Sequence, residues 1–81
     1  MKIIDRLKNG YRNKSYFISA YDNSIYLINY KEILNISDTT IMVRFNNFKL
    51  LIKGKDFRII RKSNTDLEIK GIVSNMEMIH E

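Results

Sequence analysis

Apolar and polar residues alternate along short stretches of this chain, and this alternation restricts the fold more than any other feature of the sequence. Within residues 49–60, Leu50 and Ile52 alternate with Lys49, Leu51 and Lys53, and Phe57 and Ile59 then alternate with Arg58 and Ile60. Successive side chains of a β-strand point to opposite faces of the sheet, so a period of two predicts a half-buried strand. We therefore expect one face of this segment to be apolar and the other mostly cationic.

Similar short runs recur along the whole chain. We expect seven or eight strands, within residues 15–21, 24–30, 33–36, 41–45, 49–53, 57–60, 67–70 and 76–79. Asp22-Asn23 and Asn46-Asn47 each separate two runs by two residues, and both pairs tolerate the backbone of a tight hairpin turn. This spacing predicts an antiparallel meander of short strands, curled into a small sandwich or barrel.

Composition supports an all-β chain of one small domain. The 81 residues include fourteen Ile, nine aromatic residues and a single alanine, Ala20. β-branched and aromatic side chains favour strands, whereas alanine favours helices. We assign residues 1–14 to an N-terminal arm and residues 15–79 to the β core. In the arm, Ile3, Ile4 and Leu7 have helical spacing, which leaves a short helical turn open.

Two glycines occupy similar local sequences. Gly54 ends the run Leu-Leu-Ile-Lys-Gly and Gly71 ends the run Leu-Glu-Ile-Lys-Gly. Two interpretations remain open: the segments are structural copies of each other, or each glycine simply permits a bend or bulge that ends a strand.

The residues give little sign of enzymatic chemistry. The chain has no cysteine, one histidine (His80) and three widely separated glycines. A Cys-His pair is therefore impossible, and no glycine-rich loop is present to hold a nucleotide phosphate. Four aspartates fall at predicted turns, where Asp commonly bonds its own backbone. We predict a non-enzymatic protein without a cofactor or metal site.

Positive charge is concentrated in one segment. The formal net charge is +5, and residues 44–62 carry seven basic residues against one acidic residue. The candidate partner-binding residues are Lys49, Lys53, Lys55, Arg58, Arg61 and Lys62. A solvated face that discourages edge-to-edge aggregation is the plainer interpretation. Single-stranded nucleic acid is a less favoured one, because most aromatics are in phase with the apolar face.

Several runs, taken together in their order along the chain, are more informative than any one of them. They are residues 25–31, Ile33, Ser37-Asp38, residues 41–44, the unit 50–59 around Gly54, the unit 67–72 around Gly71, and residues 76–79. In this order the chain resembles the YabP/YqfC family of bacterial sporulation proteins, most closely its YqfC branch. The resemblance implies a protein of the mother cell that acts without catalysis and binds a membrane-anchored sporulation protein.

Cellular location follows from the same observations. An early charge in the N-terminal segment argues against a signal peptide, and the longest uncharged run, residues 23–30, is far shorter than the roughly 20 residues of a membrane helix. We expect a cytoplasmic protein of the mother cell, with peripheral association at the membrane that engulfs the forespore as one option. Exposed edge strands leave homo-oligomer formation open.

Overall fold

The structure is a computed structural model that describes residues 11–12, 16–21 and 23–80. Its seven strands are β1 (Tyr11–Arg12), β2 (Phe17–Tyr21), β3 (Ser24–Ile28), β4 (Glu32–Ile36), β5 (Thr40–Arg44), β6 (Phe48–Lys62) and β7 (Asp66–His80). All neighbours are antiparallel, in the order β1-β2-β3-β7-β6-β5-β4. No helix occurs in the described residues, so the predicted all-β class is confirmed. The expected helical turn lies outside them, and β1 adds part of the assigned arm to the sheet.

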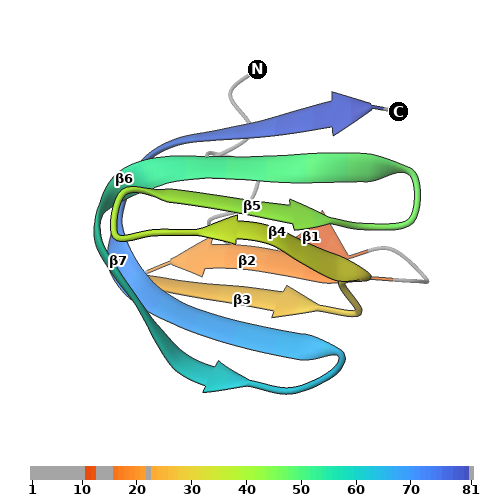
Figure 1. Cartoon of the computed structure of the whole chain (residues 1–81), viewed down its shortest axis with the longest axis horizontal. Coiled ribbons are helices and arrows are strands. Elements are labelled where there is room, and N and C mark those ends of the chain that lie inside the picture. The colour runs from red at the N-terminus through yellow and green to blue at the C-terminus, as the bar shows by residue number, and fades with distance from the viewer. Residues whose placement is uncertain (1–10, 13–15, 22, 81) are drawn as a thin grey trace.

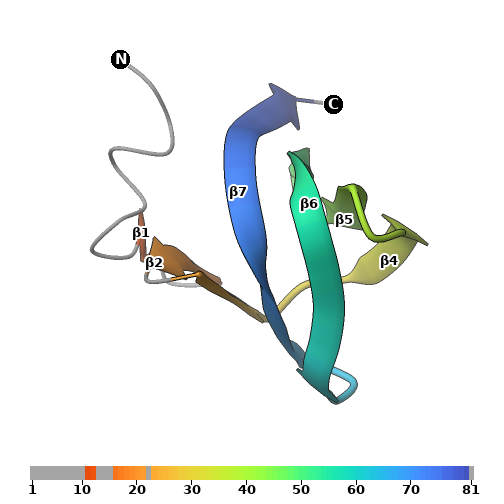
Figure 2. The same cartoon turned by 90° about the vertical axis from the view of Figure 1, so that its left-hand side faces the viewer.

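Two long strands give the single sheet two layers. β6 and β7 have 15 residues each and bend together (Figures 1 and 2). The N-terminal part of β6 pairs with β5, and the N-terminal part of β7 pairs with β3. One layer therefore contains β1, β2 and β3 with the C-terminal part of β6 and the N-terminal part of β7. The other contains β4 and β5 with the remainder of β6 and β7. The edge strands β1 and β4 do not pair, so the sheet is not closed.

Strand length and order differ from a simple meander of short strands. Each of the two long strands replaces two predicted strands, because the pairing shifts at bulges near Gly54 instead of ending there. β3 pairs with β7 and not with β4. The chain crosses between layers after β3, where the Asn29 amide donates to the Thr65 carbonyl at 2.7 Å and the Tyr30 hydroxyl donates to the Ser63 carbonyl.

The core lies between the layers and follows the predicted alternation. Ile18, Ile25, Leu27, Ile41, Val43, Leu50, Ile52 and Ile69 have no exposed surface, and Phe45, Phe48, Phe57, Leu67 and Met76 are also buried. One expected core residue is not: Ile59 is 46% exposed. It follows the last backbone contact of β6 with the β4–β5 hairpin, and the pairing shifts again between Ile59 and Arg61. β7 pairs with it on one side, but among the described residues no strand lies beside it on the other.

The two glycine segments occupy equivalent places in the two layers. Leu67 and Ile69 lie opposite Leu27 and Ile25, just as Leu50 and Ile52 lie opposite Val43 and Ile41. The amide of Gly71 donates to the Asn23 carbonyl, and the amide of Gly54 donates to the Thr39 carbonyl, both at 3.0 Å. Asn23 and Thr39 occupy the turns of their hairpins. The two segments therefore make equivalent strand pairings and equivalent hydrogen bonds to a hairpin turn, as expected of structural copies.

The predicted tight turns are present. β2 and β3 are joined by two residues, and Asn23 has a positive φ of 62°. At the second turn, which contains Asn46 and Asn47, the amide of Phe45 donates to the Phe48 carbonyl at 2.8 Å. The rings of Phe45 and Phe48 stack with centroids 5.0 Å apart. This stacking places both aromatics of that turn in the core.

Candidate binding face

The register of β6 and β7 places most of the predicted basic residues on one surface. Cα partners in an antiparallel pair project to the same face of the sheet. Lys53, Lys55, Arg58 and Arg61 lie opposite Asn75, Ile72, Lys70 and Glu68, and Lys49 lies opposite Ile79. All of these positions are out of phase with the core. We call the set Lys49, Lys53, Lys55, Arg58, Arg61 and Lys70 the basic face.

One predicted residue does not belong to this face. Lys62 lies opposite the buried Leu67, so it occupies the phase of the core although it is exposed at the end of the strand. Lys70 was not selected from the sequence. The glycine repeat contained the signal, because Lys53 precedes Gly54 as Lys70 precedes Gly71.

Few carboxylates neutralise the basic face. Glu68 forms an ion pair with Arg61 at 3.4 Å, and Glu77 lies opposite Leu51. Among the described residues, the other ion pair joins Arg44 to Glu32 on β5 and β4. Lys49, Lys53, Lys55, Arg58 and Lys70 thus have no carboxylate partner within the described part of the chain. Like charges on neighbouring strands repel, so an anionic ligand would gain energy by lying between them.

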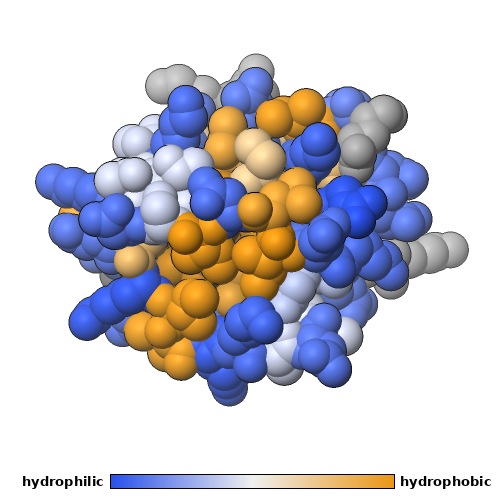
Figure 3. All heavy atoms as spheres, viewed as in Figure 1, coloured by the Kyte–Doolittle hydropathy of each residue, from blue (hydrophilic) through white to orange (hydrophobic). Residues whose placement is uncertain are grey.

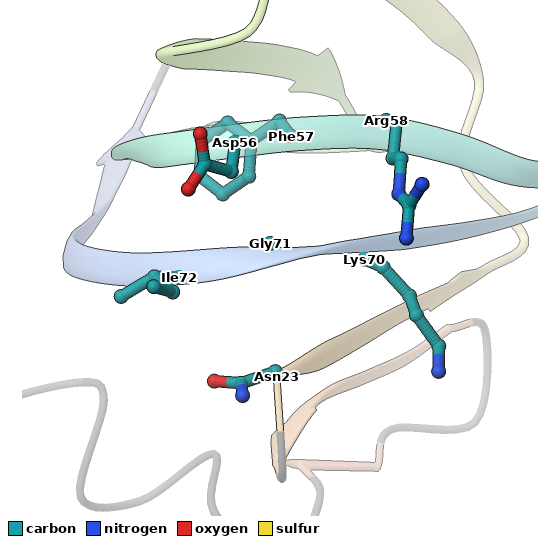
Figure 4. Close-up of a pocket in the computed structure, with 7 residues that line it drawn as sticks. All are labelled: Asn23, Asp56, Phe57, Arg58, Lys70, Gly71 and Ile72. Carbon is teal, nitrogen blue, oxygen red and sulfur yellow. The ribbon is translucent and has the colours of Figure 1, made fainter.

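A shallow pocket of about 600 Å³ lies where β6 and β7 bend, within and beside this face. It is lined by Asn23, Asp56, Phe57, Arg58, Lys70, Gly71 and Ile72 (Figure 4). Figure 4 shows the Arg58 and Lys70 side chains on the same side of the hairpin, with the Asp56 carboxylate directed away from them. Two cations beside one open pocket can hold a carboxylate or phosphate group.

Close packing of backbones forms the floor of the pocket. Gly71 has a φ of 157°, and a β-carbon on it would overlap the ring of Phe57. A β-carbon on Gly54 would overlap the carbonyl oxygen of Ile72. Asp56 has a positive φ of 60° in the bulge of β6, a conformation that Asp tolerates better than most residues. The glycines therefore act as predicted structural positions, but inside continuous strands.

Tyr26, Glu68 and Arg61 form a row across β3, β7 and β6 at the end of the basic face. Tyr26 pairs with Glu68, and Glu68 pairs with Arg61. A hydrogen bond from the Tyr26 hydroxyl to the Glu68 carboxylate raises the pKa of Tyr26, and repulsion between the carboxylate and a phenolate raises this pKa further. Burial adds to the increase, and the Arg61 charge opposes it. The carboxylate of Glu68 at this end of the basic face is therefore already paired, with the Tyr26 hydroxyl and with Arg61.

The aromatic residues divide between the two faces of the sheet. Tyr30, Phe45, Phe48 and Phe57 are buried in the core, as the sequence pattern indicates. Tyr21 and Tyr26 point outward and are 63% and 38% exposed. Tyr21 lies opposite Ser24, which in turn lies opposite Lys70, so an exposed ring shares the outer surface with the basic face.

Other site types find no support in the described residues. They contain no cluster of three or more His, Cys, Asp or Glu side chains that could hold a metal ion. His80 is the last residue of β7 and pairs with Phe48, so it belongs to a strand and not to a loose tail. No helix among the described residues has the length and hydrophobicity needed to cross a membrane.

Comparisons of the chain with family models, curated proteins and solved structures found no match in any of the three. The family resemblance and the role that it implies therefore stay predictions.

Proposed function

We propose that this protein is a non-enzymatic binding domain of sporulation, and that its basic face binds an acidic region of a membrane-anchored protein in the mother cell. One observation supports this most directly: the cations of two strands share one exposed surface with little neutralisation. The sporulation context comes from the family resemblance, and the charge of the partner comes from the face.

The electrostatics suit recognition better than stability. An exposed ion pair contributes only about 0.2–1 kcal/mol to stability, so cations without partners cost the fold little. Together they produce a field that speeds association with an oppositely charged surface and weakens as salt is added. The expected partner surface is therefore rich in Asp and Glu, and the affinity should decrease with ionic strength.

A deletion strain of the source organism tests the biological role. We expect normal vegetative growth and a large loss of heat-resistant spores, restored by the intact gene. Unchanged spore counts in a strain without a compensating homologue would contradict the sporulation role.

Charge variants test the basic face in the same assay. Lys53→Glu combined with Lys70→Glu should fail to restore resistant spores, because both charges lie on the face. Lys31→Glu, at an exposed lysine of the β3–β4 connection, is the matched control and should restore them. Thermal melting of each purified variant should show that the fold is intact. Full restoration by the folded double variant would exclude the basic face as the contact surface.

A second candidate function is binding of single-stranded nucleic acid, favoured by Tyr21 and Tyr26 on the outer surface. Exposed rings beside cations can stack bases while the cations contact phosphates. Such binding should weaken steeply with salt and decrease when Tyr21 is replaced by Ala. Fluorescence anisotropy with a labelled thymidine oligomer measures both effects. The absence of binding at low salt would eliminate this candidate.

A further inference from the structure

The C-terminal part of β6 is an open sheet edge. β5 pairs with Lys49–Lys53 of β6 and no further along it. Beyond that point, the amides of Gly54 and Phe57 donate to the carbonyls of Thr39 and Asp38, each at 3.0 Å. Among the residues that the structure describes, no strand except β7 lies beside residues 58–62.

Backbone groups on this edge are available for pairing. Alternate residues of a strand direct their amides to the same edge. The Phe57 amide points to the β5 side, so the amide of Ile59 points there as well. Within the described residues, the Ile59 amide has no hydrogen-bond acceptor. An extended segment laid against β6 would supply one.

Apolar side chains accompany the free edge. Ile59 and Ile60 are 46% and 47% exposed, side by side in β6. Leu34 on β4, which borders the same open side of the molecule, is 40% exposed. Figure 3 shows an apolar area at the centre of the face that β4 crosses in Figure 1. An edge that only had to avoid association would not be expected to expose neighbouring isoleucines.

The charge of the edge selects its occupant. Arg58, Arg61 and Lys62 flank the two isoleucines, and only Arg61 has a carboxylate partner within the described residues. Pairing of this edge with the same edge of a second copy would bring these cations together, which is unfavourable. A segment with alternating acidic and apolar residues matches both the cations and the isoleucines.

We propose that residues 58–62 of β6 bind an extended acidic segment of the partner as an added β-strand. Backbone hydrogen bonds to β6 provide affinity, and the flanking cations provide selectivity for Asp and Glu. The inference rests on the proposed function for the acidic nature of the partner, and it adds the binding mode and the place of contact.

The probe is a fluorescein-labelled peptide that alternates glutamate and valine, titrated with the full-length protein by fluorescence anisotropy. We expect saturable binding, and a loss of about tenfold or more when alternate peptide amides are N-methylated in the phase that faces β6. N-methylation in the opposite phase is the matched control and should leave the affinity within about twofold, since those amides point away from the edge. A peptide with lysine in place of glutamate should not bind.

Protein variants test the edge from the other side. Ile59→Pro removes the free amide, and proline is tolerated on edge strands, so binding should be lost while the fold is kept. Ile59→Thr should weaken binding, whereas Ile79→Thr, at an exposed isoleucine of β7 outside the pocket, should not. If Ile59→Pro fails to fold, the N-methylated peptides and the threonine pair still decide the result.

Three outcomes would overturn the inference. They are equal binding by both N-methylated phases, equal binding by the lysine peptide, and dimerisation in sedimentation velocity that Ile59→Pro abolishes. A fourth is tighter binding to phosphatidylglycerol vesicles than to the peptide, with the same dependence on Ile59 and Ile60, because the edge would then bind a lipid surface.

The spore assay separates this inference from the proposed function. If folded Ile59→Thr and Ile59→Pro variants restore resistant spores while Lys53→Glu with Lys70→Glu does not, strand addition is wrong and the basic face stands. If peptide binding depends on the edge but deletion leaves sporulation normal, the edge stands and the sporulation role is wrong.

Discussion

Gly54 and Gly71 are positions where β6 and β7 leave no room for a β-carbon, and they give the sharpest residue-scale prediction. Gly54→Ala should lower the free energy of unfolding by about 1–3 kcal/mol, because its β-carbon meets a backbone oxygen that no rotamer change can move. Gly71→Ala should have a similar cost, since its β-carbon meets the Phe57 ring in a backbone conformation unfavourable for alanine. Urea denaturation measures both, with Asn75→Ala on the exposed surface as the control.

A double-mutant cycle separates the two overlaps. Phe57→Val removes the δ-carbon nearest to Gly71, so the alanine at position 71 should cost less in that background. The cost at position 54 should stay high, because the Ile72 carbonyl is unchanged. Equal costs at position 71 in both backgrounds would show that the Phe57 ring is not the obstacle.

Tyr26 should keep its proton to higher pH than an unperturbed phenol. A phenol that donates to Glu68 holds its proton longer, so its pKa lies above the ordinary value of about 10. A raised folded-state pKa adds stability below the unfolded-state value, and this contribution is lost as pH increases through the folded-state pKa. The difference in alkaline absorbance between the wild type and Tyr26→Phe isolates the transition of Tyr26. Glu68→Gln should shift that transition to lower pH, and an unchanged transition would refute the role of Glu68.

At the scale of elements, alternation predicts which residues face the core as long as a strand stays regular. Ile41, Val43, Leu50 and Ile52 were all placed correctly, because no bulge interrupts their pairing. Ile59 was not, because a later shift in register and the short length of β5 leave it uncovered. Neither is visible locally, since coverage depends on how far a neighbouring strand extends. The sequence pattern also predicts two separate strands around Gly54. In the structure β6 continues, because its pairing with β7 shifts register there, and this long-range pairing is not visible in the local sequence.

The β2–β3 turn provides an element-scale prediction. Asn23 has a positive φ, which costs most L-residues about 1–2 kcal/mol. Asn23→Ala should therefore destabilise the protein by about 1 kcal/mol, and Asn23→Gly should be close to neutral. Thermal unfolding compares the two variants directly. A larger loss for glycine than for alanine would contradict the left-handed conformation.

For the whole molecule, segment charge identified the region of the basic face but not its full membership. Lys70 comes from a segment with net negative charge and joins the face only through the register of β6 with β7. The outward positions of Tyr21 and Tyr26 likewise depend on which face of their hairpin meets the other layer. Long-range pairing decides both, and local patterns do not contain it.

Unfolding should be a single transition, because both layers share β6 and β7. Ile25 and Ile41 occupy equivalent, fully buried positions in the two layers. Ile25→Ala and Ile41→Ala should each destabilise by about 2–5 kcal/mol and shift the same cooperative transition. Circular dichroism and tyrosine fluorescence should give coincident curves. Two separated transitions in either variant would mean that the layers unfold independently.

The bend of the β6–β7 hairpin has a consequence for the shape of any partner. Figure 1 shows this bend at the left, and the residues of the basic face lie on its outer side because they are out of phase with the buried residues. Their charges therefore spread apart on either side of the bend. A straight, rigid rod could meet the lysines before Gly54 or the cations after it, but not both at once. A pliable chain or a concave surface could wrap around the turn and engage the two groups together.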